Sequence, residues 1–210
     1  MNRLLVIFSL GLALALPALT QAQDMAPDVL AKSVTEEVIA AIKTDKDIQA
    51  GNSDKVLGLV ESMVAPHFNF ARMTRLAVGA PWRQATAPQQ QSLTDEFRTL
   101  LVRTYTSAFT QYRDQVITYR PLKLQPGDTE VVVRSQIKQK GGADPIDVNY
   151  SMEKTDKGWK VYDVMIAGIS LVQNYRSNFT TEIQKNGIDG LIKTLAEKNK
   201  SLGHTQSAKK

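Results

Sequence analysis

The spacing of apolar residues changes once along this chain, near Arg113, and this change constrains the fold class. Before it, apolar residues recur every three or four positions, which is typical of helices buried along one face. After it, apolar and polar residues alternate, which is typical of half-buried strands. Helices, then strands, then helices again predict an α+β fold in which the helices pack on one sheet face.

Four helices are predicted before the change. The first covers residues 27–43, the second begins after Asn52-Ser53, and the third is a short helix around Met73. The fourth begins with a capping-box pattern at Thr86 and continues for about 25 residues. Because this fourth helix is long and rich in aromatic residues, we expect it to lie across the sheet.

Four strands are predicted after the change, at residues 116–122, 129–139, 146–155 and 159–166. Short turns join them, so neighbouring strands should be antiparallel. Two further helices follow, separated by a break at Asn186-Gly187. We therefore expect a curved, mainly antiparallel sheet of four to five strands with N- and C-terminal helices on one face, an NTF2-like cone that encloses an apolar pocket.

The N-terminus has the features of a cleavable secretory signal over residues 1–22. Arg3 precedes an apolar run of about 13 residues, and the small-residue site Thr20-Gln21-Ala22 follows. That run is shorter than the roughly 20 residues of a membrane-spanning helix. We expect one domain over residues 23–199 and a disordered basic tail over residues 200–210.

The formal charge of +5 does not indicate a nucleic-acid partner. After removal of Arg3 with the signal, four lysines beyond residue 197 supply the remaining excess, so the body of the protein is neutral. Charge is nevertheless uneven, since residues 23–71 carry four lysines and eight acids while residues 72–120 carry seven arginines and three acids. Ordinary solvated surfaces and separate docking surfaces for different partners are both open interpretations.

Residues suited to catalysis are scarce. The chain has no cysteine, and neither His67 nor His204 has the neighbours of a metal site, so we expect no metal and no cofactor. No phosphate-binding or dinucleotide-binding glycine motif occurs. Asp163 is the one candidate for a catalytic acid or base, but we favour a strand-end carboxylate bonded to arginine or backbone. The sequence thus predicts a protein that is not an enzyme.

Apolar surface is abundant instead, on elements that should face one another. Pattern alone does not separate a pocket lining from a solid core. Our candidates for contact with an apolar ligand are Phe97, Leu101, Tyr105 and Phe109 on the long helix, Val133, Ile137, Val148, Tyr150, Met152, Val161 and Met165 on strands, and Val172 and Tyr175 on the next helix.

Several ordered blocks resemble the MlaC family, also called toluene-tolerance periplasmic phospholipid-binding proteins. The resemblance covers roughly residues 25–199. The blocks include Ala77-Val78-Gly79, Trp82-Arg83, Glu96-Phe97, Gly127-Asp128-Thr129, Trp159-Lys160-Val161-Tyr162-Asp163-Val164, Gly168-Ile169-Ser170-Leu171-Val172 and Asn174-Tyr175-Arg176.

This resemblance implies a monomeric periplasmic carrier whose cargo is phospholipid. The carrier would shuttle phospholipids between the outer and inner membranes and maintain the lipid asymmetry of the outer membrane. The implied partners are an inner-membrane ABC transporter with a substrate-binding ring and an outer-membrane lipoprotein–porin complex. A periplasmic adaptor that binds only protein, and a cone-fold enzyme that uses Asp163, remain the alternatives.

Overall fold

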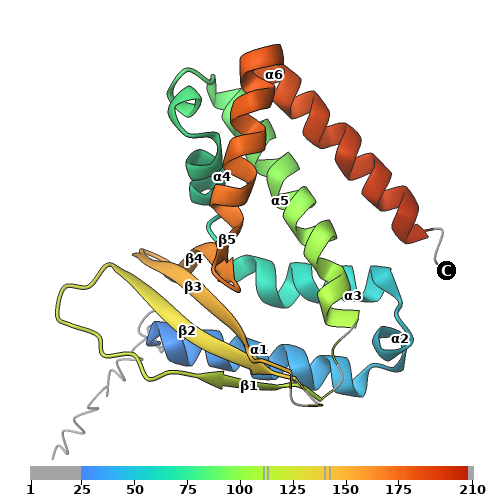
Figure 1. Ribbon diagram of the computed structural model, residues 1–210, viewed down its shortest axis with the longest axis vertical. Coiled ribbons are helices and arrows are strands. Elements are labelled where there is room, and N and C mark those ends of the chain that lie inside the picture. Colours follow the sequence, from blue (N-terminus) through green and yellow to red (C-terminus); the bar gives the residue numbers. More distant parts are fainter. Residues whose placement is uncertain (1–24, 111, 113, 140, 142, 208–210) are drawn as a thin grey trace, which may run out of the picture.

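The computed structural model describes residues 25–110, 112, 114–139, 141 and 143–207. The predicted signal peptide therefore lies outside the described residues. The predicted α+β fold is confirmed, with helices before and after one curved antiparallel sheet. Figure 1 shows the sheet beside α1, while α5 and α6 extend away from it.

The helices of the first half begin where the sequence places capping residues. Asn52 accepts hydrogen bonds from the backbone of Asp54 and Lys55, and Thr86 and Gln89 form the predicted capping box. The helical elements are α1 (Pro27–Thr44), α2 (Lys46–Gln49), α3 (Ser53–Leu59), the π-helical η1 (Val60–Val64), the 3₁₀ helices η2 (Ala65–His67) and η3 (Ala80–Arg83), α4 (Phe70–Val78) and α5 (Ala87–Thr110).

In the described part of the chain, five strands form one sheet in the order β1-β2-β3-β4-β5, with each neighbouring pair antiparallel. They are β1 (Val116–Tyr119), β2 (Glu130–Lys138), β3 (Ile146–Thr155), β4 (Gly158–Ile166) and β5 (Ile169–Ser170). β1 is shorter than predicted because Pro121, which cannot donate a backbone hydrogen bond, follows Arg120. The two-residue β5 was not predicted.

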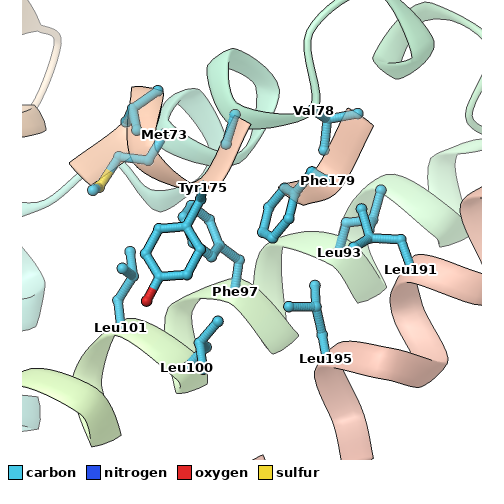
Figure 2. Packing of buried hydrophobic residues seen from close by; sticks show 12 residues of the cluster. Met73, Val78, Leu93, Phe97, Leu100, Leu101, Tyr175, Phe179, Leu191 and Leu195 are labelled. Carbon is cyan, nitrogen blue, oxygen red and sulfur yellow. The ribbon is translucent and has the colours of Figure 1, made fainter. Parts of the chain in front are cut away.

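The helix across the sheet is α1, not α5, so our expectation for the longest predicted helix is wrong. α1 packs against β2, whereas α5 packs mainly against α3, α4 and α6. Phe97 of α5 makes edge contacts with Tyr175 and Phe179, at ring-centroid distances of 5.1 Å each. Figure 2 shows this helical cluster, in which side chains from α4, α5 and α6 interdigitate. The aromatic content of α5 is therefore largely used in packing helices together.

The C-terminal segment differs from the predicted disordered tail. Element α6 (Leu171–Ser207) contains the predicted break at Gly187, where φ is 72°, and then continues as a helix through Ser207. Asn199 is buried and donates hydrogen bonds to Glu96, while Leu202 packs against the helical cluster. The chain is therefore helical through Ser207, where disorder was expected from residue 200, and residues 208–210 of the predicted tail lie outside the described residues.

Leu202→Ala should consequently lower the free energy of unfolding by about 1–2 kcal/mol, because a partly buried leucine loses its packing. Urea denaturation measures the effect. The matched control is His204→Ala on the exposed side of the same helix, which should change stability by less than about 0.5 kcal/mol. Equal stabilities of the two variants would contradict the docking of this segment.

Candidate functional site

A cavity of about 460 Å³ lies between the sheet, α1 and the C-terminal half of α5. This volume is in the range of pockets that bind small molecules, about 300–1,000 Å³. Segment 60–73 closes one side, and Leu171 at the start of α6 closes another. Ala108 lines the cavity and is also exposed, so the cavity reaches the surface beside the last turns of α5.

The lining is mainly aliphatic and aromatic. Such a surface attracts apolar ligands because it removes their hydrocarbon from water. The apolar lining residues from the helical side include Leu30, Val34, Val38, Ile39, Ile42, Val60, Val64, Phe68, Phe70, Met73, Leu101, Val102 and Phe109, and those from the sheet include Ile117, Ile137, Ile146, Val148, Met152, Val161, Val164 and Ile166.

The tyrosine hydroxyls around the cavity are bonded within the protein. Tyr119 bonds Thr35 at 2.6 Å and donates to the Ala31 carbonyl at 3.1 Å, while the Tyr150 hydroxyl lies beside Tyr119 and Ser135. Burial raises the pKa of Tyr150 above its ordinary value. Burial, together with Tyr175, raises the pKa of Tyr105 to about 12. These hydroxyls are neutral at physiological pH and already have partners, so they do not act as ionic anchors.

His67 is the titratable lining residue whose charge is most sensitive to pH near neutrality. Burial lowers the pKa of its imidazole, Lys160 lowers it further, and Glu37 opposes them. Lys160 is itself held nearby, since its Nζ donates to the Pro66 carbonyl at 2.7 Å. The imidazole is therefore uncharged at neutral pH, which keeps this part of the cavity wall neutral.

Lowering the pH should reduce stability through His67. Because the folded protein holds the His67 proton less tightly than the unfolded chain, stability is greatest above the unfolded pKa of about 6.5. It should fall as the pH drops from there through the lower folded pKa. Melting temperatures of the wild type and His67→Gln should converge or cross between about pH 7 and pH 5. Parallel curves over this range would contradict the lowered pKa.

Comparison with known proteins shows where this fold occurs. A solved structure described as the phospholipid-binding protein from Ralstonia solanacearum, in complex with a phospholipid, has 40% sequence identity and a TM-score of 0.77, covering 84% of this chain and 98% of that chain. Residues 32–197 match the family described as MlaC protein. The chain belongs to the MlaC family.

Two curated relatives agree with this assignment to the MlaC family. The toluene tolerance protein ttg2D of Pseudomonas putida is 28% identical over 187 residues, which cover 89% of this chain and 85% of that protein. The intermembrane phospholipid transport system binding protein MlaC of Haemophilus influenzae is 25% identical over 175 residues, which cover 82% of each. In the described part of this MlaC-family chain, we find no helix with the length and hydropathy needed to cross a membrane.

The structure brings most of the candidate residues to the cavity, and it places a few of them elsewhere. Phe97, Val172 and Tyr175 belong to the helical cluster, and Val133 is fully buried under α1 in the sheet cluster without lining the cavity. The candidates that line the cavity are Leu101, Tyr105, Phe109, Ile137, Val148, Tyr150, Met152 and Val161.

Strict alternation of β4 side chains predicts the wrong face of the sheet for Met165. The register of β3 and β4 shifts by one residue, since Met152 pairs with Val161 while Ser151 pairs with Asp163. This bulge adds Tyr162 to β4 and reverses the faces beyond it. Met165 is consequently 38% exposed on the outer face, whereas its neighbours Val164 and Ile166 line the cavity.

The sequence analysis did not assign α1 to the site, although α1 forms one wall of the cavity. Val34, Val38 and Ile42 lie one helical turn apart on the face of α1 that lines it. The same apolar stripe predicted the helix, but a stripe does not identify what it faces. The alternating apolar residues of β3 and the apolar face of α1 would have predicted the site only if it had been known that these two faces lie opposite each other.

Asp163 has a structural role that accounts for its carboxylate. Ser170 Oγ donates to Asp163 at 2.5 Å, and the backbone N–H of Val172 donates to it at 3.1 Å. The carboxylate therefore binds the first turn of α6, where the helix dipole favours negative charge. This arrangement matches the backbone-bonded strand carboxylate that we favoured over a catalytic group.

A charged bridge on the outer side of the sheet joins the helices to the strands. Arg72 of α4 binds Glu130 of β2 at 2.6 Å and Glu153 of β3 at 2.5 Å, and its guanidinium lies 3.7 Å from the Tyr162 ring centroid. Asn69 donates to the same Glu153 at 2.7 Å. We call Arg72, Glu130 and Glu153 the Arg72 bridge. It fixes segment 69–72 against the sheet, next to the cavity wall formed by Phe68 and Phe70.

Proposed function

We propose that this protein is a periplasmic phospholipid carrier that holds acyl chains in the cavity between α1, α5 and the sheet. The observation that supports this most is an apolar cavity in a fold shared, at 40% identity, with a structure that holds a phospholipid. The cavity residues named above, with Val164, Ile166 and the α1 stripe, are the proposed acyl-chain contacts. The capping role of Asp163 favours binding over catalysis.

The free energy of hydration explains why a carrier is needed. Two acyl chains contain about 30 methylenes, and each costs about 0.8 kcal/mol to expose to water, so free diffusion is opposed by over 20 kcal/mol. A dry cavity removes this barrier. Release must remain possible, so the cavity has to match a bilayer within a few kcal/mol. Neutral tyrosines that are bonded within the protein suit this requirement because they add no strong ionic anchor.

We further propose that the carrier shuttles phospholipids between the outer and inner membranes and so maintains outer-membrane lipid asymmetry. The name of the Haemophilus relative, an intermembrane phospholipid transport system binding protein, supports this route. The proposed donors and acceptors are an inner-membrane ABC transporter with a substrate-binding ring and an outer-membrane lipoprotein–porin complex. The predicted secretory signal supports a periplasmic location.

A transfer assay tests carriage directly. Mature protein is incubated with donor vesicles that contain a fluorescent phospholipid, separated from them, and added to unlabelled acceptor vesicles. We expect protein-bound fluorescence after separation and its gradual appearance in the acceptors. If the protein removes no lipid from the donors but binds envelope proteins tightly, the adaptor alternative replaces the carrier.

A further inference from the structure

A group of arginines on α4, η3 and α6 lies outside the lining of the cavity. Residues 70–94 and 164–181 contain four arginines and no aspartate or glutamate. In the structure these segments form α4, η3, the first turns of α5, the end of β4 with β5, and the first turns of α6, and α4 packs against α6. Arg72, Arg75 and Arg83, three of the seven arginines of residues 72–120, thus lie near Arg176 on the helices that meet here.

The four arginines have different environments in the structure. Arg72 is engaged in the Arg72 bridge, whereas Arg75, Arg83 and Arg176 are exposed. Within the described residues, none of these three takes part in an ion pair. We call the surface that carries Arg75, Arg83 and Arg176 the arginine face.

Gly79 joins the two segments that carry Arg75 and Arg83, and the side chain of Arg176 lies against it. Arg75 lies one turn before Gly79 on α4, and Arg83 ends the 3₁₀ helix that begins directly after it. The guanidinium of Arg176 crosses from α6 so closely that a Cβ on Gly79 would lie 3.3 Å from its Nη2. Contact with the Gly79 backbone restricts Arg176, which reduces the side-chain entropy lost when it binds a partner.

The surroundings favour a protein partner over a lipid surface. Among the described positions, none of the exposed large apolar residues belongs to α4, η3 or α6, the elements that carry the arginine face; they are Met25, Val29, Val116, Leu124 and Val132, with Met165 on β4 and Ile169 on β5. Without inserted apolar groups, three basic residues give only about 1 kcal/mol each near an anionic membrane, whereas lipid-binding clusters usually have 4–8. Arginine forks bind carboxylates in a bidentate manner, and half-buried Trp82 beside them is of a type enriched in protein interfaces.

We infer that the arginine face is a docking site for a protein surface that presents carboxylates. None of Arg75, Arg83 and Arg176 lines the cavity, so docking does not require the cavity to open or empty. The inference is therefore independent of which ligand the cavity holds. It also selects the second of the two interpretations of the charge asymmetry, a dedicated surface rather than general solvation.

Poly-L-glutamate serves as the probe, titrated at low salt into isotope-labelled protein. We expect chemical-shift changes at the arginine side-chain N–H groups of the arginine face. The triple variant R75Q/R83Q/R176Q should bind at least about tenfold more weakly, whereas R75K/R83K/R176K, which keeps the charge without the fork, should be intermediate. The matched control K193Q/K198Q/K200Q removes equal charge from the second half of α6 and should change binding less than about threefold.

Circular dichroism first checks that each variant is folded. If R75Q/R83Q/R176Q does not fold, R75K/R83K/R176K, which preserves the charge, still tests the inference. An equal loss of binding in R75Q/R83Q/R176Q and in K193Q/K198Q/K200Q would overturn the inference, because net charge alone would then explain the binding. Failure of the wild type to bind poly-L-glutamate would also overturn it. A third outcome would overturn it as well: binding to phosphatidylglycerol vesicles depends on these arginines, but binding to poly-L-glutamate does not. The partner would then be a membrane.

Discussion

Val148→Glu is expected to leave the protein folded and to lower its occupancy by phospholipid at least about 100-fold. Val148 is 6% exposed and lines the cavity from the first half of β3, between Ser135 and Ile166 on the neighbouring strands. When the cavity is empty, water can reach the new carboxylate. When acyl chains fill the cavity, the carboxylate is desolvated at a cost of several kcal/mol, and the bound state carries this penalty.

Thermal melting monitored by circular dichroism reports the fold of Val148→Glu, and mass spectrometry reports its lipid. The matched control is Val132→Glu, which places the same charge on the outer face of β2, where Val132 is 37% exposed. The control should retain both fold and lipid. An unfolded Val148→Glu protein would assign this residue to solid core, and a folded variant that keeps its lipid would contradict the location of the binding cavity.

Arg72→Met should lower the free energy of unfolding by about 3 kcal/mol. The side chains of Arg72 and Glu153 are only 16% and 17% exposed, so removing the cation leaves a poorly hydrated carboxylate without its charged partner. The contact with the Tyr162 ring is weakened as well. Urea denaturation with two structural probes measures the loss and tests for partial unfolding of α4 from the sheet.

The pair Arg98–Glu61 provides the control for Arg72, because its side chains are 41% and 37% exposed. Arg98→Met should cost less than about 1 kcal/mol. Acid adds a second test, since the hydrogen bond from Arg72 lowers the pKa of Glu130. This contribution is present above the unfolded pKa of about 4.5 and is lost as the pH falls through the folded value. Equal losses in both methionine variants would contradict a structural role for the Arg72 bridge.

Local patterns predicted the elements well because their causes are local. Asn52 and Thr86 cap their helices through side chains within three residues, and Gly187 breaks α6 through its own backbone conformation. The alternation over Ile146–Met152 likewise predicted the covered face of β3, where Val148 and Met152 line the cavity. In β4, strict alternation fails past the bulge at Tyr162, because one extra residue exchanges the faces of the sheet on which Val164 and Met165 lie.

The site was harder to predict because it depends on which surfaces meet. Phe97 and Leu101 lie one turn apart on the same stripe of α5, yet Phe97 packs only in the helical cluster while Leu101 also lines the cavity. α1 has an ordinary apolar stripe, and only its position on the sheet makes that stripe a cavity wall. Leu202 shows the same dependence, since a neighbouring helix orders a segment whose own composition predicts disorder.

Native mass spectrometry of the mature protein, purified from its own cell envelope without detergent, tests the proposed carrier role most directly. We predict a main species heavier than the polypeptide by the mass of a diacyl phospholipid, released on collisional activation and identified in the extracted lipid. Val148→Glu should show the bare polypeptide mass. A wild-type protein that carries no phospholipid after purification and also takes up none from added vesicles would contradict the proposal that the cavity binds acyl chains.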